Sequence, residues 1–191
     1  MGEAYPRIRQ RAQKQRGVVL WLDELGVRSQ HTAGKSYAPK GKTPVLRKTG
    51  NRFYLSVVAA ISNQGQLVFM VVEGNFNGAV LVRFVDKLIK SFDKKVFLIA
   101  DNHPVHLGRK ISEWLAAHKQ QIEMCLLPGY SPELNPVEYF NQDVKNNAAA
   151  KARPSNKQEL KKVVETFAKR KKKNPEQVKK YFHADKVKYA L

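Results

Sequence analysis

The order of short apolar segments is the feature that most limits how this chain can fold. The segment 17–24, GVVLWLDE, is a continuous apolar run that ends in two acids, as a strand buried on both faces does. Two further strand-like runs, 51–62 and 66–73, flank a turn at 63–65 and predict a hairpin. Three strands are therefore expected before the first helix.

Beyond the hairpin, helical and strand patterns alternate. The expected elements are a helix opened by Asn77, a strand at 94–101, a helix at 109–119, a strand at 122–128 and a helix capped by Asn135. A hairpin followed by strand–helix–strand crossovers gives an α/β mixed sheet, in the order βββαβαβα, with helices on both faces. Residues 1–150 are expected to form this domain, and residues 25–50 its longest irregular stretch.

Charge narrows the class of partner. The chain has 191 residues, 35 Lys and Arg against 16 Asp and Glu, and a formal charge of +19, so a polyanion such as nucleic acid is the expected partner. A single cysteine excludes an intramolecular disulfide and a cysteine-built zinc site. No run approaches the ~20 apolar residues of a spanning helix, and no signal peptide follows Met1, so a cytoplasmic protein is expected.

Residues 151–191 carry a disproportionate share of the charge. They hold 14 Lys and Arg and 4 Asp and Glu, a net +10. Apolar residues at helical spacing predict a helix with one docking face, with Ser155 as its N-cap: Leu160, Val163, Val164 and Phe167. We expect a basic helical extension packed on the first domain, and we interpret 171–173 as a solvated helix end rather than a specific phosphate site.

Three acids occupy the ends of predicted elements. Asp23 ends the first strand, Asp101 ends the fourth, and Glu138 begins the helix after the fifth. If the first and fourth strands are neighbours, the acids converge at one edge of the sheet, where mutual repulsion favours a bound Mg²⁺ ion. Strand alternation places Glu24 on the opposite face, where we expect it to be solvated.

Each acid also has a purely structural interpretation. Asp23 is an ordinary strand-end acid, Asp101 suits the turn ADNHP, and Glu138 follows Asn135 at capping-box spacing. The polar stripe of Glu138, Gln142 and Lys145 fits a catalytic cleft and a solvated face equally well. His103 and His106 beside Asp101 offer too little nitrogen and sulfur for zinc, so Asn102 and His106 are interpreted as supporting polar groups around the acids.

Four motifs together resemble a known family: LWLDE, SYAPKGKTP, FLIADNHPVH and LPGYSPELNPVEYFNQDVK. The chain from about Tyr5 to Lys145 is similar to the catalytic domain of DDE transposases of the bacterial insertion-sequence group related to mariner elements. The resemblance implies a ribonuclease-H-like fold and two Mg²⁺ or Mn²⁺ ions. It implies that Asp23, Asp101 and Glu138 are the catalytic, metal-binding triad. It further implies DNA cleavage and strand transfer at transposon ends.

The chain departs from that family in several respects. Tyr37 stands where relatives usually carry Trp, and a Trp that often follows the catalytic Glu is absent. Only 22 residues precede Asp23, so the chain resembles a catalytic half. Its expected partners are double-stranded DNA, a separate helix-turn-helix polypeptide and, in the synaptic complex, a second copy of the chain. Its expected location is the bacterial nucleoid.

Basic residues of the long loop are candidate phosphate contacts, and the alternative is that each is merely solvated. With Lys145 they form the expected DNA-binding set: Lys35, Lys40, Lys42, Arg47 and Lys48. Two rival functions fit parts of the same pattern. A non-catalytic or domesticated basic DNA-binding protein would share the charge but has no need of the acids. Another ribonuclease-H-like nuclease, acting on RNA hybrids or junctions, would share the acids but not the last motif.

Overall fold

The computed structural model forms one mixed five-stranded sheet with the spatial order β3-β2-β1-β4-β5. The structure describes residues 1, 4–29, 37–42, 52–129, 131–149, 152 and 154–191. The strands are β1 (Val18–Arg28), β2 (Tyr54–Ile61), β3 (Leu67–Val72), β4 (Val96–Ala100) and β5 (Ile122–Leu126). The first three pair antiparallel, whereas β1, β4 and β5 run parallel. The predicted α/β mixed sheet is confirmed.

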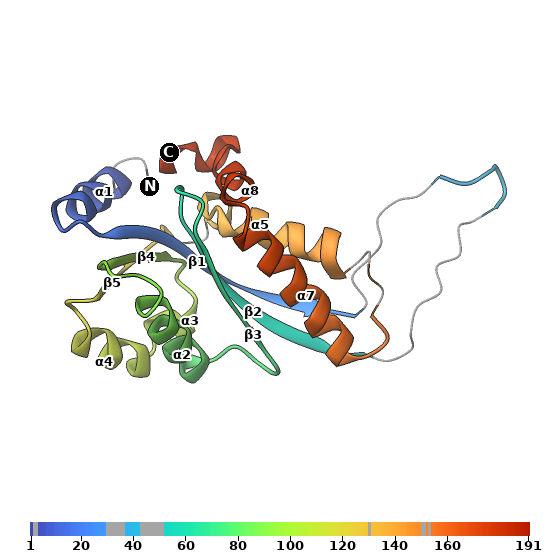
Figure 1. Ribbon diagram of the computed structural model, residues 1–191, viewed down its shortest axis with the longest axis horizontal. Helices are drawn as coiled ribbons and strands as arrows, with labels where there is room; N and C mark the ends of the chain where they lie inside the picture. The colour runs from blue at the N-terminus through green and yellow to red at the C-terminus, as the bar shows by residue number, and fades with distance from the viewer. Residues whose placement is uncertain (2–3, 30–36, 43–51, 130, 150–151, 153) are drawn as a thin grey trace.

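Helices cover both faces of the sheet, as predicted. Figure 1 shows α2, α3 and α4 on one side and α5 and α7 on the other. The helices are α1 (Ala4–Lys14), α2 (Gly78–Ile89), α3 (Pro104–Leu107), α4 (Arg109–Ala117), α5 (Val137–Asp143), α7 (Lys157–Lys172) and α8 (Pro175–Lys179). A π-helical stretch, η2 (Val144–Ala149), continues α5, and the short 3₁₀ turns are η1 (Pro132–Leu134), η3 (Lys180–Phe182) and η4 (Asp185–Ala190). No helix among the described residues is long and apolar enough to cross a membrane.

Strand alternation divides the core into two clusters, one on each face of the sheet. On β1, Trp21 and Leu25 face the cluster built with α1, α5 and α7, while Leu20 and Leu22 face the cluster built with α2 and α4. Odd-numbered positions of β1 therefore face α5, and even-numbered ones face α2. This alternation decides that the adjacent acids Asp23 and Glu24 lie on opposite faces.

Three local predictions were wrong. Helix α1 was not predicted, because its buried residues Tyr5, Ile8 and Ala12 form a narrow stripe in a very basic segment. Strand β1 extends through 25–28, which the sequence suggested was irregular; Gly26 breaks the apolar pattern, but the strand pairs with β2 as far as Arg28. The α7 helix is capped by Asn156, whose side chain accepts the Glu159 N–H at 2.8 Å, and not by Ser155.

The C-terminal segment contacts the elements that carry the acids. Its predicted docking residues on α7 lie in the same core cluster as Trp21 and Phe140. The Tyr189 hydroxyl donates to the Leu134 carbonyl at 2.7 Å and accepts the Trp21 indole N–H at 3.0 Å. The end of the chain thus holds together β1, two residues before Asp23, and the segment that leads into α5.

The turn between β2 and β3 makes a testable contact with α8. Gly65 has φ of +87°, and a Cβ atom there would lie 2.6 Å from the Pro175 carbonyl oxygen. We expect Gly65→Ala to lower the free energy of unfolding by about 2–4 kcal/mol, because left-handed strain and overpacking add. Urea denaturation measures the loss. Gly41→Ala is the control, since Gly41 has φ of +82° but open space around it, and an equal loss in both variants would contradict the packing component.

Candidate active site

Pairing between β1 and β4 brings the first two acids to one edge of the sheet. The two strands are parallel neighbours, and Trp21 pairs with Ile99. Two positions later in the chain lie Asp23, which is buried, and Asp101, which is half-exposed and directly follows β4. The expectation that Asp23 ends the first strand is wrong, because β1 continues to Arg28. The condition stated from the sequence, that the first and fourth strands are neighbours, is therefore met, and the register places both acids at the same level.

Glu138 is brought to this edge by the anchoring of α5 on β1. The Asn135 side chain donates to the Leu22 carbonyl at 2.9 Å, one residue before Asp23, and its Oδ1 accepts the Val137 N–H at 3.1 Å. Asn135 thus caps α5, as predicted, and also ties the start of the helix to β1. The capping box, which was the structural alternative for Glu138, does not form, because the Asn135 N–H donates to the Pro132 carbonyl at 2.9 Å. The Glu138 carboxylate is therefore not needed to accept the Asn135 N–H.

Asp23 is the buried centre of the acid cluster. Its Oδ1 accepts the Glu24 N–H and its Oδ2 accepts the Asn141 amide, both at 2.9 Å. Burial raises the pKa of Asp23 well above its usual range. The negative charge of Glu138 adds the next largest increase to this pKa, and Glu24 and Asp101 add smaller ones. Glu138 and Asp101 are therefore close enough to Asp23 for their charges to act on it.

Asp101 is oriented by the turn that follows β4. Its Oδ1 accepts the His103 N–H at 3.1 Å and lies 2.8 Å from His106 Nδ1, which is also 3.0 Å from the Asp101 carbonyl. The hydrogen bond from His106 lowers the pKa of Asp101. Burial alone would lower the pKa of His106, but its bonds to Asp101 and the charge of Glu24 outweigh burial and raise it. Asp101 is thus held ionised while Asp23 is pushed toward protonation.

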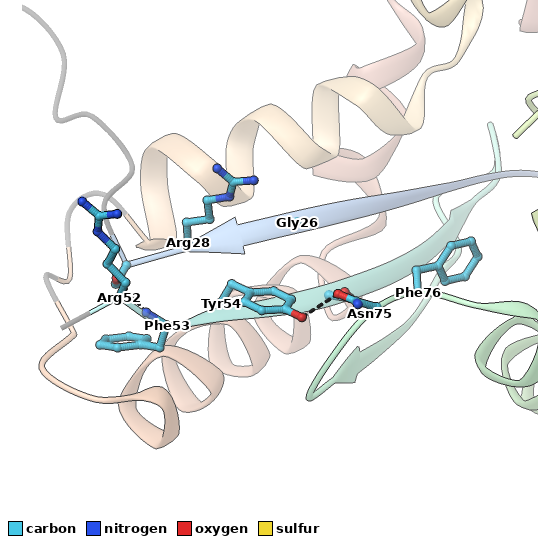
Figure 2. A pocket seen from close by; sticks show the side chains of 9 residues that line it. Gly26, Arg28, Arg52, Phe53, Tyr54, Asn75 and Phe76 are labelled. Atoms are coloured by element: carbon cyan, nitrogen blue, oxygen red, sulfur yellow. Dashed lines mark hydrogen bonds between the residues drawn. The ribbon is translucent and has the colours of Figure 1, made fainter.

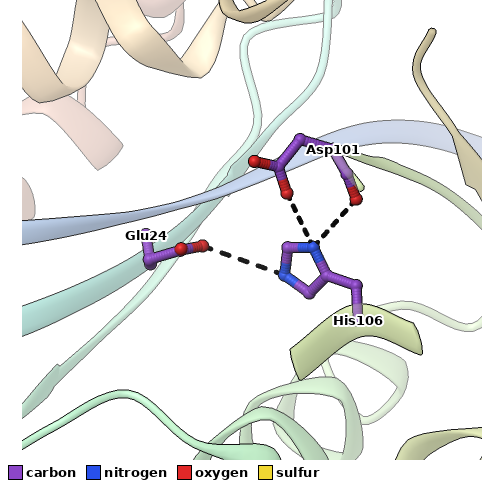
Figure 3. Close-up of side chains that lie close together, drawn as sticks. All are labelled: Glu24, Asp101 and His106. Carbon is purple, nitrogen blue, oxygen red and sulfur yellow. Dashed lines mark hydrogen bonds and ion pairs between the residues drawn. The ribbon is translucent and has the colours of Figure 1, made fainter. Parts of the chain in front are cut away.

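The expectation that Glu24 is solvated is wrong. Glu24 does lie on the face opposite Asp23, but its side chain is only 20% exposed, and its Oε2 is 3.8 Å from His106 Nε2 (Figure 3). His103 Nε2 lies 3.7 Å from Glu24 Oε1. Strand alternation predicted the correct face for Glu24. It could not predict that His103 and His106, at the start of α3, cover that face. Within the described part of the chain, Glu24, Asp101 and His106 form a trio of potential metal ligands whose ligand atoms lie within 4.8 Å of one another.

The donor set of the acid cluster fits hard divalent cations. Asp23, Asp101 and Glu138 offer carboxylate oxygens, which Mg²⁺ and Mn²⁺ prefer. Burial, and after it repulsion by Glu138 and the other nearby acids, raises the pKa of Asp23, and a cation would relieve the repulsion. In addition, the Oδ1 atom of Asn141, whose amide holds Asp23, is buried without a hydrogen-bond partner. The cluster therefore suits a bound cation better than an uncompensated set of charges.

The other predicted site residues are placed as follows. Lys40 and Lys42 are exposed. Lys145 is half-buried on η2, about two helical turns after Glu138. Lys35, Arg47 and Lys48 lie outside the described residues. The Asn102 side chain donates to the Leu127 carbonyl at 3.1 Å, so it holds the end of β5 against the loop after β4.

A cavity of about 610 Å³ lies further along β1, and sequence reasoning did not single out its residues. Figure 2 shows Arg28 and Arg52 at one end and Phe76 at the other. Phe76 also lies over His106, with ring centroids 5.9 Å apart, so the cavity adjoins the Glu24 side of the acid cluster. Guanidinium groups and aromatic rings are the side chains that contact nucleic-acid phosphates and bases. The available sequence signal for this cavity was the run of one arginine and two aromatic residues at 52–54.

Asn141 is the other residue that the sequence analysis missed. It lies three positions after Glu138, one helical turn along α5, and is 1% exposed. The available signal was an amide at i+3 from the catalytic candidate, on the same side of the helix. From the sequence alone, a polar residue at that position could equally face solvent. Its role becomes clear only from its contact with Asp23, 118 positions away in the sequence.

A sheet of this topology, with one acid on a central strand, a second just after the adjacent parallel strand and a third at the start of a later helix, is typical of ribonuclease-H-like enzymes that cleave nucleic acids. Within that class the chain has a definite place. Residues 18–161 match the model of the DDE superfamily endonuclease family, and the chain belongs to this family. No curated protein sequence matches the chain.

Solved structures with the same fold include those of the Mos1 mariner transposase. The Mos1 strand transfer complex aligns with a TM-score of 0.72 at 18% identity, over 98% of this chain and 57% of that one. The Mos1 mariner paired end complex with Mn aligns equally well, over 97% and 57%. The catalytic domain of Mos1 aligns with a TM-score of 0.59 at 13% identity, over 98% and 90%. The chain therefore spans little more than half of the longer Mos1 chains and has the ribonuclease-H-like fold of their catalytic domain.

Proposed function

We propose that this chain is the catalytic domain of a DNA transposase, which cleaves DNA strands at transposon ends and joins them to target DNA. The observation that carries the proposal is the placement of three acids by adjoining elements: β1 and β4 pair in parallel two residues before Asp23 and Asp101, and Asn135 ties the start of α5, which carries Glu138, to β1. Membership of the DDE endonuclease family and similarity to Mos1 complexes that contain transposon ends support the same reaction.

In this proposal Asp23, Asp101 and Glu138 hold two Mg²⁺ or Mn²⁺ ions. When bound, such ions activate the attacking hydroxyl and stabilise the leaving oxygen of the phosphodiester. The chain's own groups fix the ligands: the Glu24 N–H and Asn141 amide orient Asp23, and His106 orients Asp101. Similarity to Mos1 structures solved with Mn and with Mg supports the choice of metal.

Two supporting residues hold the frame around these acids. Asn102 ties the loop after β4 to the end of β5, and Asn135 ties the start of α5 to β1. Because each links the element that carries one acid to its neighbour, we infer that they keep the acids in register when DNA is bound.

Double-stranded DNA is the proposed substrate. The formal charge of +19 gives the affinity, and phosphate contacts are assigned to Lys40, Lys42 and Lys145 in the described part of the chain. The predictions for Lys35, Arg47 and Lys48 stand on the sequence alone. A homodimeric synaptic complex, a separate helix-turn-helix polypeptide and action at a bacterial nucleoid are further parts of the proposal, and they follow from the family resemblance.

The decisive experiment is DNA nicking with purified protein. We expect supercoiled plasmid to be nicked when Mg²⁺ or Mn²⁺ is present and to remain intact in EDTA, because the acids need a cation to act on a phosphodiester. Agarose gels measure the nicked fraction. Tight DNA binding without nicking in either metal would favour the non-catalytic DNA-binding alternative. Preferential cleavage of an RNA–DNA hybrid would favour the alternative nuclease.

A further inference from the structure

Two buried polar atoms face each other on the side of the sheet opposite Asp23. Glu24 Oε2 and His106 Nε2 are 3.8 Å apart, and each is buried without a hydrogen-bond partner. The great majority of buried polar atoms in proteins have a hydrogen-bond partner, so two unpaired atoms at this separation indicate a contact that closes with a small movement. Figure 3 shows the His106 ring lying between Glu24 and Asp101.

The opposite edge of the ring fixes its protonation pattern. His106 Nδ1 lies 2.8 Å from the Asp101 carboxylate and 3.0 Å from the Asp101 carbonyl, and both oxygens are acceptors, so Nδ1 carries a proton. The remaining nitrogen, Nε2, points at Glu24. The Phe76 ring packs edge-on against the imidazole, and the His106 side chain is fully buried. The ring therefore cannot turn without losing its bonds to Asp101.

The donors to Asp101 converge on one oxygen. The His103 N–H and His106 Nδ1 both bond to Oδ1, and within the described residues Oδ2 accepts no hydrogen bond. The orientation of His106 thus decides which Asp101 oxygen remains for another ligand. A group that fixes a ligand's partner tunes the ligand itself, as in the carboxylate–histidine pairs around many metal sites.

We propose that Glu24 is a positioning residue, which holds His106 in the orientation that presents Asp101 to the acid cluster. This inference rests on the proposed function. One strand then carries both parts of the arrangement: Asp23 supplies its own carboxylate on one face, and Glu24 orients the partner carboxylate from the other. Neither Glu24 nor His106 needs to contact DNA or metal in this role.

The test compares three substitutions in the full chain. Glu24→Met fills the same volume without a polar group, Glu24→Gln keeps a hydrogen-bonding amide opposite Nε2, and Glu113→Met is the control on an exposed glutamate of α4. We expect Glu24→Met to weaken Mn²⁺ binding and plasmid nicking by about 10–100-fold, the usual effect of removing a group that orients a metal ligand. Glu24→Gln should restore most of both, and Glu113→Met should match wild type.

Three readouts separate positioning from other roles. Mn²⁺ titration and nicking report the site, and thermal unfolding without metal reports the fold; Glu24→Leu replaces Glu24→Met if that variant does not fold. Equal losses in Glu24→Met and Glu24→Gln would assign the effect to the charge of Glu24 and overturn positioning through His106. Wild-type Mn²⁺ affinity in Glu24→Met would also overturn it, leaving the proposed function intact. A wild-type protein that neither binds Mn²⁺ nor nicks DNA overturns both.

Discussion

Glu138→Gln will abolish metal-dependent nicking while leaving the protein folded. We expect a loss on the order of 10³-fold, since a metal-bound carboxylate contributes several kcal/mol to the reaction and each 1.36 kcal/mol is tenfold in rate. Glutamine preserves the size of the side chain and one oxygen, but it removes the negative charge that an ion requires. Plasmid nicking at saturating Mn²⁺ measures the loss.

The same substitution tests the structural alternative for Glu138. If Glu138 were part of a capping box, Gln would serve equally well and activity would be retained. In the structure the Asn135 N–H already donates to the Pro132 carbonyl, and the Asn135 side chain caps the helix by accepting the Val137 N–H. We therefore expect the free energy of unfolding to change by less than about 0.5 kcal/mol.

Glu133→Gln is the matched control for this prediction. Glu133 is exposed on η1, five positions earlier in the same proline-rich approach, and carries the same charge. Its replacement should leave both nicking and stability at the wild-type level. Equal cleavage by wild type and Glu138→Gln would remove Glu138 from the active site, whatever the control shows.

The sequence predicted those parts of the site that depend on local pattern and topology. Apolar runs located β1 and β4, and a right-handed crossover allows these strands to be neighbours; the structure meets that condition, and Asp23 and Asp101 come together. Asn135 was recognisable as a cap because Pro136 follows it and cannot donate a hydrogen bond. These features need only a few adjacent residues, or a rule that holds for nearly all folds.

The parts that escaped prediction depend on contacts between distant segments. The role of Asn141 is its hydrogen bond to Asp23, and no local sequence pattern near either residue predicts that contact. Glu24 was assigned to the correct face, but His103 and His106, at the start of α3, pack over that face and bury it. Alternation predicts which way a side chain points and says nothing about what covers it.

Asp23→Asn will also abolish nicking, and unlike Glu138→Gln it will make the metal-free protein more stable. A carboxylic acid whose pKa is raised by folding binds its proton more tightly in the native state than in the unfolded state. The ionised form therefore opposes folding at neutral pH. Asparagine removes that charge; its oxygen still accepts the Glu24 N–H, and its NH2 donates to the unpaired Asn141 Oδ1 once the Asn141 amide turns over. We expect a gain of roughly 0.5–2 kcal/mol, as is common when a strained active-site group is removed.

The sign of this effect gives it a distinctive pH dependence. The penalty from Asp23 is fully present above its raised native pKa, falls as the pH drops through that value, and vanishes below the unfolded pKa of about 3.9. The stability difference between Asp23→Asn and wild type should therefore shrink on acidification. Urea denaturation without divalent metal, at a series of pH values, measures it.

Added metal should reverse the order of stability. Mg²⁺ or Mn²⁺ that binds the native wild type stabilises it by mass action, whereas the Asp23→Asn variant lacks a ligand and gains little. Asp86→Asn on α2, which removes a half-exposed acid paired with Lys90, should show neither the gain without metal nor the loss of response with it. If Asp23→Asn is less stable than wild type without metal, the hydrogen bonds of the Asp23 carboxylate outweigh its repulsion by Glu138 and Asp101. The acid cluster would then stabilise the fold without a bound cation.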